Sequence, residues 1–232
     1  MMGRAFAALL FVALAAAPLG AQAPPPSAAA TTDPTFYSVA SIEVKPSGRA
    51  AAVQALKQYK DACRINTASL RTELFEQADR PGHLLLVETW QSQAAFDNGT
   101  PALRKRLNDA MQPIRLSDWD QRPYKTLSVA SGAAEASGRS VFVISHVDVA
   151  PDPKIAGMLK DLAEKSRLEE GNVRFDVLAH TMRSNHFEVI ETWQNQKALD
   201  NHAAAAHTRQ YRDNLQPALG SPLDERIYKA IE

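Results

Sequence analysis

The chain has 232 residues, and 26 lysines and arginines balance 26 aspartates and glutamates. This balance, without a long run of one sign, makes nucleic acid and anionic membranes poor partners and favours a small or neutral ligand. The single cysteine, Cys63, excludes an intrachain disulfide, so stability must come from burial, for which 45% apolar residues suffice. We expect Cys63 itself to be a small buried hydrophobe.

The N-terminus has the layout of a secretory signal peptide. Arg4 precedes an apolar run over residues 5–19, and small residues follow it up to Ala21. We therefore expect cleavage near Ala21, a periplasmic or secreted protein and no membrane anchor, because the run is too short to span a bilayer. Residues 22–34, rich in alanine and proline, predict a disordered leader.

An internal repeat organises the rest of the chain. Residues 88–98 return as residues 191–201, and the motifs around them recur in the same order. The matching flanks are Gln112-Pro113 with Gln216-Pro217, Tyr124-Lys125 with Tyr228-Lys229, His83 with His186, and Val44 with Val149. The sequence thus predicts two copies of one unit, at 35–129 and 140–232, joined by a linker at 130–139 and related by a pseudo-twofold axis.

The second copy gives the clearer order of elements. Alternating apolar residues predict a strand at 140–149, and helical spacing after Pro151 predicts a helix that ends near Gly171. Two strands at 172–180 and 186–193 should form a hairpin, followed by one helix at 195–215 and a last strand at 226–231. In the first copy, Thr100-Pro101 should interrupt the second helix.

The order β-α-β-β-α-β predicts a ferredoxin-like unit, an antiparallel sheet with two helices on one face. Phe142 and Ile144 would leave the other face apolar, so the two units should pack sheet to sheet and trap a cavity. The fold class we expect is α+β, with tandem repeats forming an intramolecular pseudo-dimeric α/β barrel. Exposed edge strands would leave a homodimer of fused barrels possible.

The second copy resembles the antibiotic biosynthesis monooxygenase domains of the dimeric α/β barrel superfamily. The residues that carry the resemblance are Glu170-Gly171-Asn172, Arg174-Phe175-Asp176-Val177, Phe187 to Trp193, Ala198-Leu199-Asp200-Asn201-His202 and His207. The resemblance implies a monooxygenase that needs no flavin, metal or other cofactor and that oxidises a quinol or small phenolic aromatic with molecular oxygen. The haem-degrading pattern of the superfamily does not match at His146, His202 and Arg212.

Two histidines are the candidate catalytic residues. His202 lies where the family often carries histidine, and an imidazole can take a phenolic proton near neutral pH. His146 shares the cavity face with Phe142 and Ile144. We expect the two halves to enclose one cavity that both rings line. The competing interpretations are that His202 is a half-exposed helical histidine without a function and that His146 is a hydrogen-bonded core histidine.

The substrate-binding candidates around these histidines are Trp193, Phe142, Asn172, Tyr211 and His207. His207 follows His202 by five residues, which on one continuous helix places the side chains about 140° apart. The spacing therefore predicts no shared metal. The repeated Glu-Thr-Trp at 88–90 and 191–193 is interpreted as structural, with the tryptophan packing over the next helix.

The first copy lacks these features, because Gly99 stands for His202, Arg104 for His207 and Ala68 for Gly171. It is therefore interpreted as the partner that completes the barrel. Two alternatives remain open. One is a non-catalytic small-ligand-binding or stress-related module with the same barrel, and the other is a structural dimerisation module whose cavity is filled.

Overall fold

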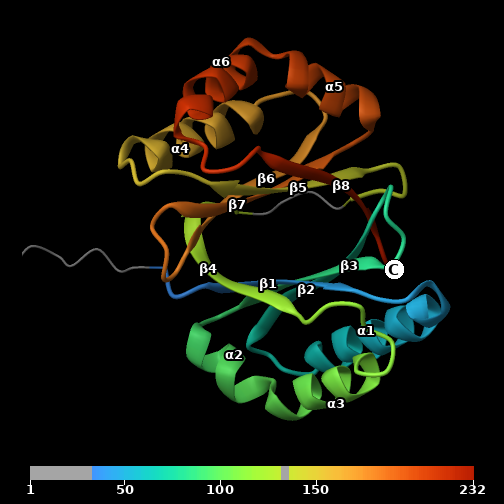
Figure 1. Ribbon diagram of the computed structural model, residues 1–232. Helices are drawn as coiled ribbons and strands as arrows, with labels where there is room; N and C mark the ends of the chain where they lie inside the picture. The colour runs from blue at the N-terminus through green and yellow to red at the C-terminus, as the bar shows by residue number, and fades with distance from the viewer. Residues whose placement is uncertain (1–32, 132–135) are drawn as a thin grey trace, which may run out of the picture. The chain divides into compact units, whose positions relative to one another are not determined.

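The computed structural model describes residues 33–131 and 136–232 (Figure 1). The predicted signal peptide (1–21), most of the predicted leader (22–34) and the middle of the predicted linker lie outside the described residues. The first repeat comprises β1 (Phe36–Glu43), the short 3₁₀ helix η1 (Pro46–Gly48), α1 (Arg49–Cys63), β2 (Ser69–Gln77), β3 (His83–Trp90), α2 (Gln93–Gly99), α3 (Pro101–Met111) and β4 (Asp120–Ser128).

The second repeat follows the same order. It comprises β5 (Val141–Asp148), α4 (Lys154–Ser166), β6 (Asn172–His180), β7 (His186–Trp193), α5 (Gln196–Ala204), α6 (Ala206–Leu215), the 3₁₀ helix η2 (Gln216–Ala218) and β8 (Asp224–Ala230). The predicted α+β fold of two ferredoxin-like repeats is confirmed. None of the helices in the described part of the chain has the length and apolar character needed to cross a membrane.

The strands of both repeats join in one closed barrel with the order β1-β3-β2-β8-β5-β7-β6-β4. Two seams join the repeats, with Tyr124 of β4 opposite His180 of β6, and Tyr228 of β8 opposite Gln77 of β2. These two pairs occupy equivalent positions in the two repeats, as a pseudo-twofold axis requires. The expectation of exposed edge strands is wrong, because each outer strand of one repeat pairs with a strand of the other.

Local sequence fixes where the helices begin. Ser92 and Asn195 precede α2 and α5, and their side chains accept hydrogen bonds from the backbone N–H groups of Ala95 and Ala198 at 3.1 and 3.0 Å. Gly171 precedes β6 with φ of +85°, and a side chain there would also meet the Ala198 Cβ at 2.6 Å. Glycine therefore lets this turn approach α5 closely.

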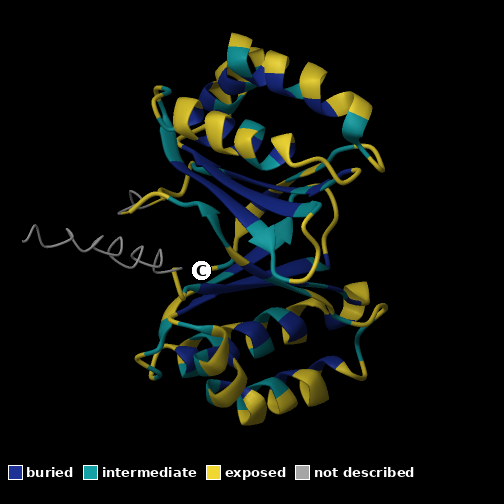
Figure 2. Cartoon of the chain, turned by 90° about the vertical axis from the view of Figure 1, so that its left-hand side faces the viewer, coloured by how far each residue is buried: buried dark blue, intermediate teal, exposed yellow. Residues whose placement is uncertain are grey.

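Three apolar cores hold the fold. Helices α1–α3 cover the outer face of the first sheet and α4–α6 that of the second, and Figure 2 shows buried strands beneath helices whose outward faces are exposed. The third core fills the space between the sheets and includes Phe75, Tyr124, Leu178 and Ile190, each at most 1% exposed. Aromatic and aliphatic side chains from both sheets interdigitate there, so the predicted inter-sheet cavity is reduced to pockets beside this core.

A buried ion network crosses from one repeat to the other inside the barrel. Arg174, which is 5% exposed, contacts Asp176 of its own strand at 2.5 Å and Glu73 of β2 at 2.8 Å. Glu73 also pairs with Arg71, whose side chain is 43% exposed. Arg174 thus compensates the buried Asp176 of its own repeat and the partly exposed Glu73 of the other.

Replacing Arg174 by methionine should lower the free energy of unfolding by about 3–5 kcal/mol, because it leaves the buried Asp176 carboxylate without its cation. Urea denaturation followed by circular dichroism measures this. The matched variant Arg71→Met removes the exposed partner of the same glutamate and should cost at most about 1 kcal/mol. Equal losses in the two variants would show that Arg174 does not hold the repeats together.

The expected burial of Cys63 is confirmed, because its side chain lies at the end of α1 with no exposed surface. Burial, together with the nearby Glu88 carboxyl, raises the pKa of the Cys63 thiol to about 11. The native protein should therefore not react with a disulfide reagent such as DTNB at mildly alkaline pH, since thiolate is the reactive form. One thiol per chain should react once guanidinium chloride unfolds the protein, and rapid native labelling would contradict this assignment.

Candidate active site

The second sheet borders a different pocket on each of its faces. On β5, His146 points into the barrel as predicted, whereas Ser145 and Val147 face the helices α4–α6. His202 of α5 lines the helix-side pocket. The expectation that both imidazoles line one hollow is wrong, because the sheet itself lies between the two rings.

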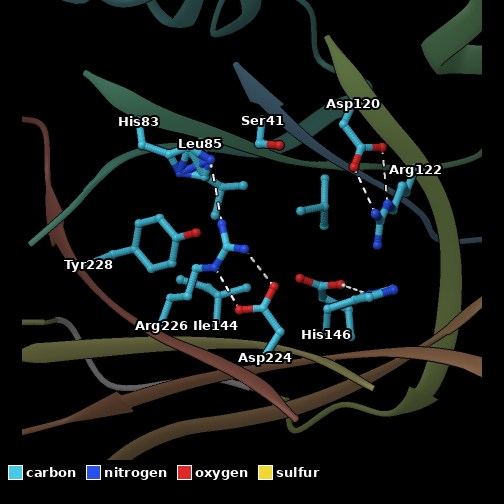
Figure 3. Close-up of a pocket in the computed structure, with 12 residues that line it drawn as sticks. Ser41, His83, Leu85, Asp120, Arg122, Ile144, His146, Asp224, Arg226 and Tyr228 are labelled. Atoms are coloured by element: carbon cyan, nitrogen blue, oxygen red, sulfur yellow. Dashed lines mark hydrogen bonds and ion pairs between the residues drawn. The ribbon is translucent and has the colours of Figure 1, made fainter. Parts of the chain in front are cut away.

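The barrel-side pocket lies beside the strand ends and holds about 100 Å³ (Figure 3). The His146 Nδ1 atom lies 3.2 Å from Glu188 Oε2, and the Tyr124 hydroxyl donates to the same oxygen at 2.9 Å. Two guanidinium groups, those of Arg122 and Arg226, border the pocket from β4 and β8. These arginines occupy equivalent positions in the two repeats.

Both arginines are already paired within their own strands. Arg122 contacts Asp120 at 2.7 Å, and Arg226 contacts Asp224 at 2.6 Å. Burial, with the neighbouring Arg226 guanidinium, lowers the pKa of His83, which also lines the pocket. The charged lining suits a small hydrogen-bonding molecule better than an apolar ring, which needs a mostly apolar pocket.

The helix-side site of the second repeat is built around His202, which is 4% exposed. Its ring stacks on the Trp193 indole of β7, with centroids 4.6 Å apart and planes at 28°. Its Nδ1 atom lies 2.6 Å from Oε1 of Glu169, in the turn between α4 and β6. The Trp193 indole N–H donates to Glu191 at 2.8 Å, which places a second carboxyl 3.8 Å from His202 Nε2.

A break in the second helix brings His207 to the same carboxylate. The predicted single helix at 195–215 is wrong, because Ala205 adopts an extended conformation (φ −65°, ψ 143°) between α5 and α6. His207 Nε2 lies 3.0 Å from Glu169 Oε1, the oxygen that also contacts His202. The separation of about 140° expected on a continuous helix therefore does not apply.

Burial sets the protonation states in this site. It raises the pKa of the Glu191 carboxyl to about 8, so this group is uncharged at neutral pH. It also lowers the pKa of His202, although the Glu169 carboxylate opposes this shift. Since a carboxylate oxygen only accepts, Nδ1 of the neutral imidazole carries the proton. The lone pair of Nε2 is then free on the side of Glu191 and can accept a proton.

The space beside His202 is small and lies under a wider groove. The inner pocket holds about 10 Å³, room for about one water molecule, and Ser145 has a buried hydroxyl there without a partner in the described part of the chain. A groove of about 150 Å³ between α4 and α6 lies outside it. Leu162 and Tyr211 line both spaces, so these two side chains separate His202 from the groove.

The first repeat fills the equivalent place with a salt bridge. Arg104 donates to the fully buried Glu88 at 2.7 Å, and the Tyr59 hydroxyl donates to the other oxygen of this carboxylate at 2.8 Å. The Arg104 guanidinium also lies 4.0 Å above the centre of the Phe96 ring. The first repeat therefore offers neither an imidazole nor a free carboxylate at this position.

Comparison with known proteins places these sites in a family. The family model for antibiotic biosynthesis monooxygenase matches residues 35–99 and 154–214, together more than half of the chain. The chain belongs to this family. The two matched segments fall one in each repeat, so the tandem copies are confirmed as two antibiotic biosynthesis monooxygenase domains.

Individual relatives agree with this assignment. YcnE of Bacillus subtilis, named as a candidate monooxygenase, is 27% identical over 82 residues, which cover 34% of this chain and 86% of YcnE. A structure described as a candidate monooxygenase from Fusobacterium nucleatum has a TM-score of 0.76 at 16% identity, covering 85% of this chain and 93% of that one. An anthrone oxidase-like protein has a TM-score of 0.68 at 12% identity, covering 86% and 92%. At these identities the two structures show a shared fold.

Within this antibiotic biosynthesis monooxygenase fold, the structure brings together only some of the predicted site residues. His202, Trp193, Tyr211 and His207 meet on the helix side of the second repeat. Three other candidates do not join them. Phe142 packs on Phe75 inside the barrel at 5.1 Å, Asn172 donates to the backbone of Arg174, and His146 lines the barrel-side pocket.

Sequence reasoning missed Glu169 and Ser145 and interpreted Glu191 as structural only. A comparison of the two repeats would have indicated the first two, because Asn66 and Ala40 stand at the equivalent positions of the first repeat. Glu191 does have a structural partner in the Trp193 indole, but it also lines the pocket. No local sequence pattern distinguishes a glutamate that only binds the tryptophan from one that also lines a pocket.

The Arg104–Glu88 pair generates a prediction about the first domain. Arg104→Met should lower the free energy of unfolding by about 3–5 kcal/mol, because it leaves a fully buried carboxylate without its cation. The exposed neighbour Arg106→Met is the matched control and should cost less than about 0.5 kcal/mol.

Adding Glu88→Gln to Arg104→Met should restore part of the loss, because the neutral amide needs no counter-ion. Chemical denaturation of the four proteins measures both effects. A double variant no more stable than Arg104→Met alone would show that the charge of Glu88 is not the cause.

Proposed function

We propose that this protein is an exported monooxygenase that oxidises a quinol or related small phenolic aromatic with molecular oxygen in its second domain, without flavin or metal. The observation that carries the proposal is the contact of 2.6 Å between Glu169 and the buried His202, which leaves the Nε2 atom of a neutral imidazole free to act as a base. Family membership supports the reaction class, and the signal-like N-terminus supports export.

The proposed reaction balances without another reactant. His202 Nε2 takes the hydroxyl proton of a phenol, and the phenolate passes one electron to O₂, which gives a phenoxyl radical and superoxide. These combine in a new C–O bond at a ring carbon that carries hydrogen, and the imidazolium returns its proton to the resulting peroxide. Cleavage of the O–O bond with loss of the ring hydrogen releases water and leaves a carbonyl, so one oxygen atom enters the quinone product.

The surroundings of His202 fit this chemistry. Trp193 stacks on the His202 ring and fixes its orientation, and the uncharged Glu191 adds no negative charge that would oppose formation of a phenolate. The unpartnered hydroxyl of Ser145 is available to a substrate oxygen. A ring needs more space than the inner pocket offers, so binding requires Leu162 and Tyr211 to turn toward the outer groove.

Oxygen uptake with simple hydroquinones tests the proposal. The wild-type protein should consume one O₂ per molecule of quinone formed, and His202→Ala should lower kcat/KM by about 10²–10⁴-fold, the range for loss of a general base. Glu169→Gln should lower it less, because the amide can still orient the ring. An oxygen electrode and product absorbance measure both quantities.

His146→Ala discriminates between the two pockets, because His146 lies on the opposite face of the same sheet. Loss of activity in His146→Ala with retention in His202→Ala would move the reaction to the barrel-side pocket and overturn the assignment. Melting curves of all variants establish that they fold.

The small volume of the inner pocket favours one alternative, a non-catalytic module that binds a small ligand. Such a module would bind a hydrophobic aromatic at the α4–α6 groove without consuming oxygen. Calorimetric binding of a hydroquinone analogue, with no oxygen uptake across a panel of hydroquinones, would identify it.

A further inference from the structure

Three side chains of the second repeat converge on one point as metal ligands do. The carboxylate of Glu169 and one ring nitrogen each of His202 and His207 lie within 4.8 Å of one another. A single oxygen, Glu169 Oε1, contacts His202 Nδ1 at 2.6 Å and His207 Nε2 at 3.0 Å. We propose that this cluster is a binding site for a divalent transition metal ion and that the bound ion inhibits the reaction proposed above.

The donor set defines the class of ion. Two imidazole nitrogens and one carboxylate oxygen suit Zn²⁺, Co²⁺, Ni²⁺ or Cu²⁺ better than Mg²⁺ or Ca²⁺, which prefer oxygen ligands. In the metal-free protein, protons between Glu169 and the two rings hold the donors close together. A metal ion with bonds of about 2.0–2.2 Å would replace those protons and needs only small shifts of the three side chains.

The backbone supports this convergence. His207 reaches Glu169 only because Ala205 interrupts the helix and lets α6 start in a new direction. The ring of His207 then lies 6.0 Å from that of His202, between centroids. On one unbroken helix, the two imidazoles would point to different sides.

A comparison of the two repeats gives independent support for the metal site. None of the three ligand residues is present at the equivalent position of the first repeat. In the folded repeats, Asn66, Gly99 and Leu103 stand in the first where Glu169, His202 and His207 stand in the second, because Leu103 and His207 line equivalent pockets between the helices. The alignment of Arg104 with His207 is therefore wrong by one residue. A side chain at Gly99 would meet the Asn66 amide at 2.5 Å, so these positions are adjacent in the first repeat too. The same fold therefore forms in the first repeat without the ligand set.

The site is accessible from outside the protein. The Glu169 and His207 side chains are 17% and 21% exposed, whereas His202 is 5% exposed. His207 also lines the groove between α4 and α6, so an ion can enter there and keep a water molecule as a further ligand. Three protein ligands with one open position resemble a reversible or reactive metal site more than a closed structural one.

The inhibitory effect rests on the proposed function. A metal ion on Nδ1 of His202 takes the lone pair of that atom, so the neutral ring must carry its proton on Nε2. His202 then cannot accept a phenolic proton at Nε2. Metal binding and base catalysis therefore exclude each other, and bound metal should suppress oxygen uptake.

Metal titration of the chelator-treated full-length protein tests the binding site directly. Zn²⁺ in competition with a chromophoric chelator should show one tight site per chain, and Co²⁺ should give visible absorption bands of a nitrogen- and oxygen-ligated ion. His207→Gln and Glu169→Gln should each weaken binding by more than about 100-fold, since loss even of an outer partner of a metal ligand costs up to about that much.

His186→Gln is the matched control. His186 belongs to a second histidine group at the barrel end, with ring centroids 5.7 Å from His146 and 6.0 Å from His180, and its loss should leave Zn²⁺ affinity within about twofold of wild type. Melting curves without metal show whether each variant is folded. Absence of tight binding in folded wild type, or loss in His186→Gln with retention in His207→Gln, would overturn the site.

Oxygen uptake separates the two proposals. Saturating Zn²⁺ should suppress wild-type uptake by at least about tenfold, and removal of the ion by EDTA should restore it. Uptake that persists with the site filled would overturn the inhibitory role. If no form consumes oxygen, the proposed function fails while the metal titration still decides the binding site.

Discussion

The two-sided apolar sheet is the constraint on which this structure depends. Each repeat covers one face of its sheet with its own helices, and the opposite face has no cover within the repeat. Face-to-face packing of the two sheets buries Phe75 and Tyr124 of the first repeat against Leu178 and Ile190 of the second. The covalent link makes this association intramolecular, and closure of the barrel pairs every outer strand.

Duplication allows the two helix-side sites to diverge, because closure of the barrel requires only the strands and inner sheet face of each repeat. The first repeat places Arg104 over Glu88 and so compensates a buried charge internally. The second keeps Glu191 buried without a cation at hydrogen-bonding distance and directs His202 and His207 toward Glu169. One half thus contributes mainly to the barrel, whereas the other holds a cluster of imidazole and carboxyl groups of the kind that chemistry or ligand binding requires.

In the helix-side site, the imidazole of His202 can act in two ways. His202 can accept a proton through Nε2 while Nδ1 donates to Glu169, or it can bind a metal ion through Nδ1. The same carboxylate supports both states, because one oxygen accepts the hydrogen bond from Nδ1 or coordinates the ion. Occupancy of Nδ1 therefore decides whether the base is available.

The sequence alone determined the repeat, the order of strands and helices, and the faces of β5, because periodicity and turn residues act locally. It therefore indicated that His146 faces the barrel, but it also placed His146 and His202 in one site. Only the tertiary structure decided that side chains fill most of the barrel interior, that the sheet separates His146 from His202, and that Glu169 joins two histidines. Those facts depend on how side chains from distant segments interlock and on a single extended residue, Ala205, and helical periodicity predicts neither.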